Sequence, residues 1–221
     1  MMNLQAEYQN KGYVSVPGIF TRQQVRAIKA DAIRILTRDG KLGTPSGVNV
    51  WMLDQIDPSL LQPVIDPRLV GILRELIGDS PEFLSAKTVF KSGTKRFPSP
   101  WHQDWFYWKG STKISAWIAL DDATEANGCL RLIPGTHRKV FTMAQIKNET
   151  GFERQIPPAE LEGMEPVTVP AAAGDVVFFH DLAVHASHPN TSGDDRWSLI
   201  STYRDRSEPD ESTAWATSLP L

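Results

Sequence analysis

Apolar residues recur at helical spacing in two segments of the first eighty residues. In residues 21–37 they return every three or four positions, and Thr21 with Gln24 matches a capping box at the start. In residues 67–77 leucines repeat in the same way, after a capping Asp66 and a proline and before a glycine. We therefore predict two amphipathic helices in these segments.

After residue 80 the pattern changes to short runs rich in β-branched and aromatic residues. Turn-forming pairs such as Pro134-Gly135 separate the runs, and an earlier short strand at 13–20 is broken by Pro17-Gly18. The predicted strands are 82–91, 101–108, 113–120, 129–133, 166–169, 175–180 and 197–203. Short strands that follow two helices predict a mainly β fold with flanking helices, either an antiparallel sandwich or a barrel.

The length of 221 residues favours one domain, 1–221. Within it we expect helical support in 1–80, a β core in 81–204 and a polar tail in 205–221, mobile or lid-like. Two stretches lack a clear period. Residues 40–60 are expected to form a long loop, and 139–163 an insertion of loop and short helix.

Charge and composition narrow the classes of function. The chain has 23 Lys and Arg against 26 Asp and Glu, a net charge of −3, which excludes a strongly basic nucleic-acid binder and gives no attraction to an anionic membrane. No window approaches 18 uncharged apolar residues, and the single cysteine, Cys129, excludes an intrachain disulfide. We expect a cytoplasmic protein with no nucleic-acid or membrane partner. The oligomeric state stays open.

Histidines are few and concentrated, and this is where metal chemistry is expected. His102 and Asp104 form an H-x-D pair in the predicted strand 101–108. In a strand, residues i and i+2 face the same side, about 7 Å apart at Cα. A further histidine from a distant segment would complete a 2-His-1-carboxylate triad, which binds Fe(II) and leaves positions open. Alone, H-x-D is a weak signal, because it arises often by chance.

Three histidines, His180, His185 and His188, compete for the third position. Arg196 follows His185 by 11 residues, across turn-forming residues. If two antiparallel strands fold about 190–191, His185 and Arg196 lie opposite each other. The guanidinium would then lie beside the metal, where it can bind a carboxylate bidentately. In the same pairing register no Lys or Arg lies opposite either of the other two histidines, so the pattern favours His185.

The other histidines and the aromatic run have ordinary interpretations. His137 is expected to stabilise a turn, His188 to lie at the surface, and His180 to pack inside, with a pocket-lining role as the alternative. The run Trp105-Phe106-Tyr107-Trp108 favours core or lid packing over a cage for a cationic ligand.

Four segments resemble the phytanoyl-CoA dioxygenase family, which includes ectoine hydroxylase-like enzymes. They are GYVSVPGIFT at 12–21, WHQDWFYW at 101–108, SAWIALDDATEANGCLRLIPGTHR at 115–138 and AGDVVFFHDLAVHASHPNTSGDDR at 173–196. The resemblance implies a double-stranded β-helix (jelly roll, cupin-like). It also implies an Fe(II)- and 2-oxoglutarate-dependent oxygenase that consumes O₂.

The resemblance also assigns roles to residues. It implies iron ligands at His102, Asp104 and His185, and Arg196 as the partner of the distal carboxylate of 2-oxoglutarate. The further positions that match cosubstrate-side residues of the family are Ser187, Lys91 and Trp117, and Lys91 carries no specific role.

The expected reaction is oxidation of a small organic molecule, generally a hydroxylation, with release of succinate and CO₂. Residues of 40–60, 105–110 and the tail around Trp215 are expected to line the substrate pocket. No feature indicates an acyl-CoA thioester. Two alternatives remain open: a non-catalytic β-barrel that binds small molecules, and a hydrolase that uses Zn²⁺ at the same residues.

Overall fold

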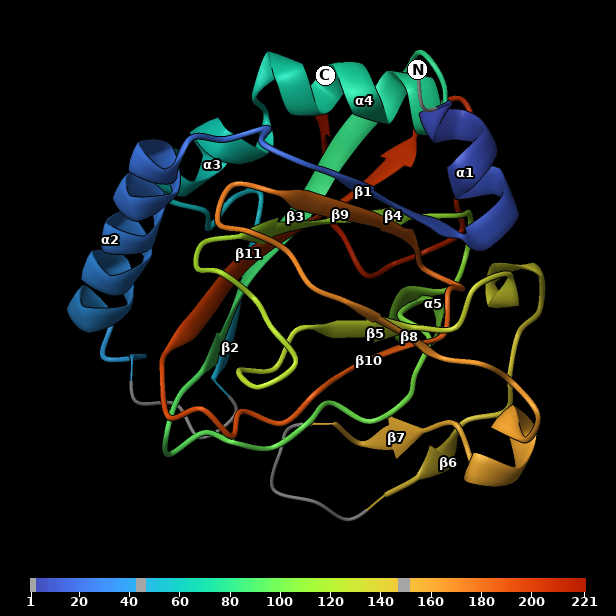
Figure 1. Ribbon diagram of the computed structural model, residues 1–221. Helices are drawn as coiled ribbons and strands as arrows, with labels where there is room; N and C mark the ends of the chain where they lie inside the picture. Colours follow the sequence, from blue (N-terminus) through green and yellow to red (C-terminus); the bar gives the residue numbers. More distant parts are fainter. Residues whose placement is uncertain (1–2, 43–46, 147–151) are drawn as a thin grey trace.

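Strands dominate the chain after residue 80 in the computed structural model, which describes residues 3–42, 47–146 and 152–221 (Figure 1). The helices are α1 Leu4–Lys11, α2 Arg22–Arg38, α3 Pro58–Val64, α4 Pro67–Ile77 and α5 Trp105–Trp108, with 3₁₀ turns at Thr136–Arg138 and Pro158–Leu161. The strands are β1 Tyr13–Val16, β2 Val48–Met52, β3 Pro81–Lys91, β4 Ile114–Ala119, β5 Leu130–Leu132, β6 Ala144–Gln145, β7 Arg154–Gln155, β8 Val167–Val169, β9 Val176–His180, β10 His185–Ser187, β11 Arg196–Asp205 and β12 Leu219–Pro220.

Two antiparallel sheets form the body of the fold. The larger sheet has the order β1-β9-β4-β11-β3-β12, with β2 paired to β3, and the smaller has the order β10-β5-β8. A separate two-stranded ribbon is formed by β6 and β7. The mainly β architecture with flanking helices is therefore as the sequence predicts.

The larger sheet is buried on both faces, which explains the continuous burial of its central strand β4. Ile114, Ala116 and Ile118 belong to the hydrophobic cluster that includes α2, α3 and α4. Trp117 and Ala119 point to the opposite face, where they share a cluster with residues of the smaller sheet. Alternate side chains of a strand face opposite sides, so one strand joins the helical layer to the second sheet.

The predicted helices form where the pattern placed them. Thr21 and Gln24 make both bonds of the capping box of α2, and the apolar stripe of α2 is buried. Asp66 caps α4 by accepting from the backbone N–H of Arg68. Figure 1 shows α4 lying across the end of the sheet and α2 along its flank. Every helix of the described residues is too short or too polar to cross a membrane.

Two expectations about local structure are corrected, and one helix was not predicted. Residues 40–60 hold β2 and α3 rather than a continuous loop, although 43–46 lie outside the described residues. Helix α1 has no amphipathic pattern that would have revealed it; its start is capped by Asn3. The segment 139–163 contains a strand ribbon and a 3₁₀ turn, with 147–151 outside the described residues.

The tail, expected to be mobile or lid-like, packs against the larger sheet. Strand β12 pairs with the start of β3. Asp210 accepts from the Nζ of Lys113, a lysine with a fully buried side chain, and Trp215 packs on Trp108 with ring centres 5.2 Å apart. Trp215 of the tail thereby lines one wall of a pocket between the two sheets.

Candidate active site

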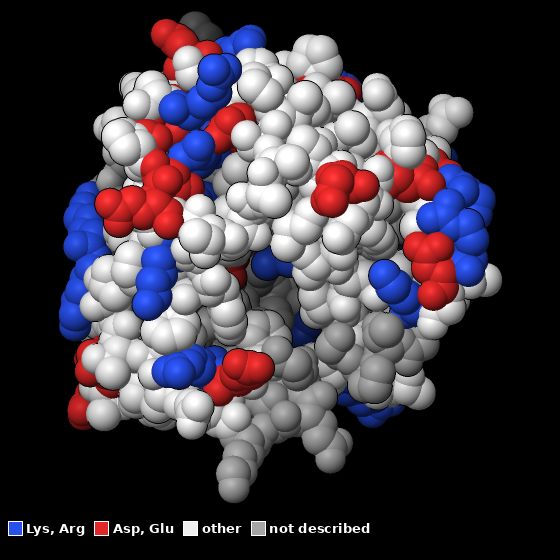
Figure 2. Space-filling model, turned by 180° about the vertical axis from the view of Figure 1, so that it is seen from behind, with Lys and Arg blue, Asp and Glu red and all other residues white. Residues whose placement is uncertain are grey.

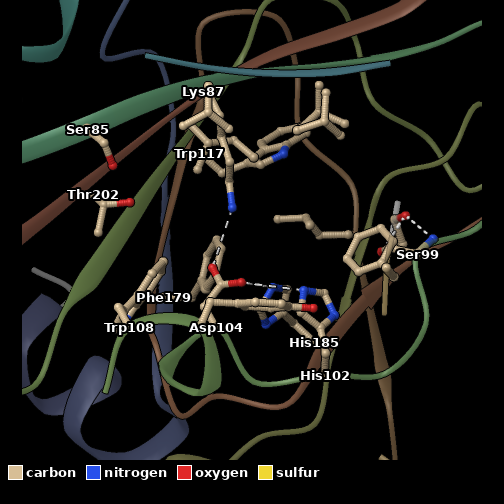
Figure 3. Close-up of a pocket in the computed structure, with 18 of the residues that line it drawn as sticks. Ser85, Lys87, Ser99, His102, Asp104, Trp108, Trp117, Phe179, His185 and Thr202 are labelled. Carbon is tan, nitrogen blue, oxygen red and sulfur yellow. Dashed lines mark hydrogen bonds and ion pairs between the residues drawn. The ribbon is translucent and has the colours of Figure 1, made fainter. Parts of the chain in front are cut away.

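His102, Asp104 and His185 meet at one point between the two sheets. Their ligand atoms all lie within 4.8 Å of one another, and all three side chains are buried. Asp104 Oδ1 is 3.4 Å from His102 Nε2 and 3.8 Å from His185 Nε2. Figure 3 shows the carboxylate and the two imidazoles side by side at the floor of the pocket. Two imidazole nitrogens and one carboxylate at these separations are a donor set suited to Fe(II).

The backbone brings the three residues together in a different way from the predicted strand 101–108. His102 forms an isolated bridge with His185, each N–H donating to the other's carbonyl at 3.0 Å. After Gln103 the chain turns, because Asp104 adopts a helical backbone conformation and immediately precedes α5. The prediction of a strand is therefore wrong beyond His102. A bridge and a helical turn, rather than i and i+2 on one strand, place the two ligands together.

Hydrogen bonds at the far nitrogens orient both imidazoles. His102 Nδ1 donates to Pro100 O at 2.8 Å, and His185 Nδ1 donates to Ala183 O at 2.9 Å. Since each Nδ1 carries the proton, each Nε2 keeps its lone pair directed at the shared point. Burial, followed by the nearby His102, lowers the pKa of His185 to about 3. The ring is therefore neutral at pH 7, as a metal ligand must be.

Asp104 is ionised and lacks hydrogen-bond donors for one of its oxygens. Burial alone would raise the pKa of Asp104, but Lys87 and the two histidines together hold it well below its usual range. Asp104 Oδ2 is buried without a hydrogen bond, and Lys87 Nζ lies 3.7 Å away. Oδ2 thus has only the ion-pair contact with Lys87, while Oδ1, beside the two histidine Nε2 atoms, is the oxygen available to a metal.

Gln103, between the two ligands, holds this segment in place, and the sequence analysis did not identify it. Its side-chain amide donates to Lys139 O at 2.7 Å and to Leu182 O at 2.6 Å, and its carbonyl accepts from Phe141 N–H at 2.9 Å. The side chain of Gln103 is not among those that line the pocket. Gln103 is 1% exposed, and the sequence alone did not indicate this burial.

Arg196 reaches the same pocket, but not through the predicted hairpin with His185. Arg196 begins β11 and pairs with Lys91 of β3, whereas His185 pairs with Leu132 of β5 in the other sheet. The expectation that 185 and 196 face each other across a turn is therefore wrong. Both residues line the pocket because the two sheets that carry them enclose it.

The guanidinium of Arg196 is buried without an acidic partner among the described residues. It is 2% exposed, donates to Ser198 Oγ and to Gly128 O at 3.0 Å each, and keeps Nε without a partner. Burial lowers the pKa of Arg196 to about 10. The ring centre of Trp117 lies 5.5 Å from its central carbon. A cation held in this way is suited to an anionic ligand.

Lys91 and Ser187 also lie in the pocket wall. Lys91 Nζ donates to Phe97 O at 2.7 Å and to His188 O at 2.8 Å. Burial, and then Arg196, lowers the pKa of Lys91 to about 7. Ser187 Oγ lies 2.8 Å from Ser99 Oγ. These contacts link β3 and β10 to the loop between β3 and α5.

The pocket has a volume of about 520 Å³ and is bounded by both sheets, α5 and the tail. The expected lining regions all contribute, through β2, through Tyr107 and Trp108, and through Trp215. In Figure 3, Ser85 and Thr202 lie at one end, Ser99 at the other, and the metal-ligand triad between them. On the face opposite to Figure 1, the surface is hollowed near its centre and Lys or Arg atoms show inside the hollow (Figure 2).

The remaining histidines lie outside the pocket lining. His180 stacks on Tyr8, with ring centres 6.3 Å apart, and accepts from the N–H of Leu182. His137 contacts Gln9 O, consistent with its expected structural role. His188 is half-buried and its Nε2 is 3.0 Å from the hydroxyl of Thr168, so it is less exposed than expected.

Comparison with known proteins connects this geometry to a family. The family model described as "Phytanoyl-CoA dioxygenase (PhyH)" matches residues 8–198. An ectoine dioxygenase of Bordetella parapertussis is 25% identical over 224 residues, covering 89% of this chain and 72% of the relative. A probable alpha-ketoglutarate-dependent hypophosphite dioxygenase of Stutzerimonas stutzeri is 27% identical over 213 residues, covering 85% and 73%.

A solved structure supports the same relationship. The epimerase SnoN, in complex with Fe³⁺, alpha ketoglutarate and nogalamycin RO, aligns with a TM-score of 0.76 at 26% identity, covering 91% of this chain and 82% of that one. The predicted double-stranded β-helix is thereby confirmed. The binding-only and zinc-hydrolase alternatives are not retained. The chain belongs to the phytanoyl-CoA dioxygenase family and is an Fe(II)- and 2-oxoglutarate-dependent dioxygenase that acts with O₂ on a small molecule.

Proposed function

We propose that His102, Asp104 and His185 hold the iron, through the two Nε2 atoms and Asp104 Oδ1. One observation carries this assignment: three buried ligand atoms lie within 4.8 Å of one another while both Nδ1 protons are bonded to backbone carbonyls. Asp104 Oδ1 is the oxygen nearer both histidines, and Oδ2 faces Lys87. One carboxylate oxygen is thus directed at the metal site and the other is kept out of it.

In this proposal Arg196 binds the distal carboxylate of 2-oxoglutarate. Two buried cations, Arg196 and Lys91, have no acidic partner in the part of the chain that the structure describes. They lie on paired residues of adjacent strands, so this part of the pocket is suited to a dianion. Trp117 covers the guanidinium and excludes water from it. Ser187 supplies a hydroxyl to the cosubstrate, and Lys91 positions the wall through its two carbonyl contacts.

When bound, iron and 2-oxoglutarate supply the oxidative chemistry, in which the keto acid yields succinate and CO₂ as O₂ is activated. The chain's own residues do the rest. The two histidines and Asp104 would supply three ligands to the metal and would leave its remaining positions for other ligands. Gln103 holds that segment rigid, and the aromatic wall excludes water from the reacting atoms.

The outcome we favour is hydroxylation of a small organic molecule. The relatives are named for ectoine and hypophosphite, and the structural neighbour for an epimerisation, so the shared machinery serves different substrates and outcomes. A pocket of about 520 Å³ lies within the usual range for small-molecule sites, and its lining is mostly apolar. A compact substrate fits beside the cosubstrate there.

The test is anaerobic reconstitution with Fe(II), followed by 2-oxoglutarate and O₂. We expect one iron per chain and O₂ uptake that requires 2-oxoglutarate and releases succinate. His185→Ala should weaken iron binding more than about 100-fold, because even loss of a group that merely supports a ligand costs 10- to 100-fold. His188→Ala, a matched change three residues away and outside the pocket lining, should bind iron as the wild type does.

Unchanged iron affinity in His185→Ala would remove this residue from the ligand set. Wild-type protein that binds iron but shows no succinate release with 2-oxoglutarate would contradict the assignment of the cosubstrate pocket.

A further inference from the structure

A third cation, Lys87, faces the pocket at a distance from the proposed 2-oxoglutarate end. Residues 85, 87, 89 and 91 of β3 alternate toward the pocket, so Lys87 and Lys91 share one face of the strand. Four residues of strand separate their Cα atoms by about 13 Å. Lys87 pairs with Ile200 of β11, four residues along from Arg196. The pocket therefore has two cationic regions, one at Arg196 and Lys91 and the other at Lys87.

Lys87 has only a weak partner. Its Nζ lies 3.7 Å from Asp104 Oδ2, an ion-pair distance that is too long for a hydrogen bond, and Figure 3 shows the ammonium extended toward that carboxylate. The side chain is 26% exposed. When Asp104 binds iron, the charge of the carboxylate is shared with the metal, and Lys87 is left facing the pocket without a full counter-charge. A largely buried cation in that position favours an anion among the pocket's occupants.

Two hydroxyls, those of Ser85 and Thr202, lie on the same face of the sheet as Lys87. Ser85 and Thr202 are paired across β3 and β11, both line the pocket, and their side chains are drawn next to each other in Figure 3. Neither hydroxyl makes a side-chain hydrogen bond to the part of the chain that the structure describes. A cation with two nearby hydroxyls is a set of donors that suits an oxyanion.

The wall next to these donors is aromatic. Trp108 and Trp215 pack together with ring centres 5.2 Å apart, and both line the pocket. Trp108 is held in place because its indole N–H donates to Asp181 at 2.9 Å. Trp215 comes from the tail, beyond the residues matched by the family model. This wall favours an apolar or ring-shaped body next to the anionic group.

We propose that the substrate carries a carboxylate that binds Lys87, with Ser85 and Thr202 assisting, while its apolar body lies against Trp108 and Trp215. This assignment rests on the proposed function and names the substrate class. A single carboxylate matches a single ammonium. A dianionic phosphate would leave one charge uncompensated, since the pocket lining among the described residues offers no further cation beyond Lys91 and Arg196.

The experiment compares two probes of the same shape on protein loaded with Mn(II) and 2-oxoglutarate, which does not turn over. Cyclohexanecarboxylate and cyclohexanecarboxamide are titrated under argon while the tryptophan fluorescence is read. We expect the carboxylate to bind at least tenfold more tightly than the amide to wild type. Lys87→Met should reduce the ratio to below threefold, and Lys87→Arg should keep it.

Lys109→Met is the matched control, because Lys109 is an exposed lysine close to α5 that does not line the pocket; its ratio should equal that of wild type. Equal affinities of the two probes in wild type overturn the proposal, and so does a preference that survives in Lys87→Met. Cyclohexylphosphonate that binds more tightly than the carboxylate overturns the choice of a carboxylate. Binding of 2-oxoglutarate is measured first: its failure counts against the proposed function, whereas failure of the probes alone counts only against Lys87.

Discussion

Replacement of Arg196 by methionine has two expected effects of opposite sign. In the ligand-free protein the guanidinium is 2% exposed and has no acidic partner among the described residues. Removing a buried ion recovers a desolvation penalty of several kcal/mol, which offsets the loss of the two hydrogen bonds that Arg196 donates. With 2-oxoglutarate bound, the same change removes a buried charge pair, which costs about 2–5 kcal/mol. The affinity for 2-oxoglutarate should therefore fall by about 30-fold to 4,000-fold.

Thermal unfolding of the Mn(II)-loaded protein measures both effects. At a concentration 100 times its dissociation constant, a ligand stabilises by about 2.7 kcal/mol, which for a chain of this length raises Tm by about 5–11 °C. If Arg196→Met weakens binding 100-fold, the same concentration contributes about 0.4 kcal/mol, a rise of about 1–2 °C. Without 2-oxoglutarate, the variant should melt at or above the wild-type temperature.

Arg22→Met is the control, since Arg22 forms an exposed ion pair with Asp122. It should retain the full response to 2-oxoglutarate. If Arg196→Met keeps more than half of the wild-type response, Arg196 does not bind the cosubstrate. If the ligand-free variant instead melts far below wild type, its bonds to Ser198 and Gly128 matter more than the charge.

Three further predictions concern the structure around the site. Burial, and then Arg196, lowers the pKa of Lys91 to about 7 from its usual 10.5, so between these pH values the unfolded chain binds more protons than the folded one. The free energy of unfolding should therefore rise by up to about 1.4 kcal/mol per pH unit above pH 7. Urea unfolding of Lys91→Met should lack this slope. Gln103→Leu leaves two carbonyls and one N–H without partners and should lower the free energy of unfolding by about 3 kcal/mol in urea, with a loss below about 1 kcal/mol contradicting its role. Asp210→Ala removes the carboxylate from the buried ammonium of Lys113, and should speed amide hydrogen exchange in 205–221; unchanged exchange would show that this pair does not hold the tail.

The regular elements could be predicted because each follows a local pattern. The stripe of α2, the cap of α4 and the strands that became β3, β4, β9 and β11 all carry their period in consecutive residues. Helix α1 carries no apolar stripe, and β2 spans only five residues with one exposed position at its centre. These two form because they pack on neighbours, α1 next to β1 and β2 along β3.

The site residues were found more reliably than their geometry. The H-x-D spacing identified His102 and Asp104, although Asp104 occupies the N-cap position of a helix instead of continuing a strand. The 11-residue spacing identified Arg196, although its neighbour in the sheet is Lys91 and not His185. Spacing along the chain cannot show which sheet a strand enters, since that depends on pairing with distant strands. The resemblance to the family indicated the roles of these residues, and the structure shows a different backbone path from the predicted one.

Lys87 was missed although its signal was in the sequence. It lies four residues before Lys91 in a correctly predicted strand, so the two lysines had to share a face. A lysine on an inner face is rarely accommodated without a partner or a function. Gln103 had no such signal, because a polar residue between two ligands is equally compatible with an exposed position.

The balance of charge in the pocket connects the proposals for Arg196 and Lys87. Among its described lining residues, Asp104 is the one acid, against the three bases Lys87, Lys91 and Arg196, and iron adds two further positive charges. A diacid at the Arg196 side and a carboxylate at the Lys87 side would offset most of this excess. Each anion offsets part of the same excess of positive charge. Binding of the first anion should therefore reduce the electrostatic attraction that the pocket exerts on the second. The two ligands should therefore compete weakly through charge while they occupy separate ends. A lower affinity for cyclohexanecarboxylate, but not for its amide, when 2-oxoglutarate is present would show this coupling directly, and it should vanish in Lys87→Met.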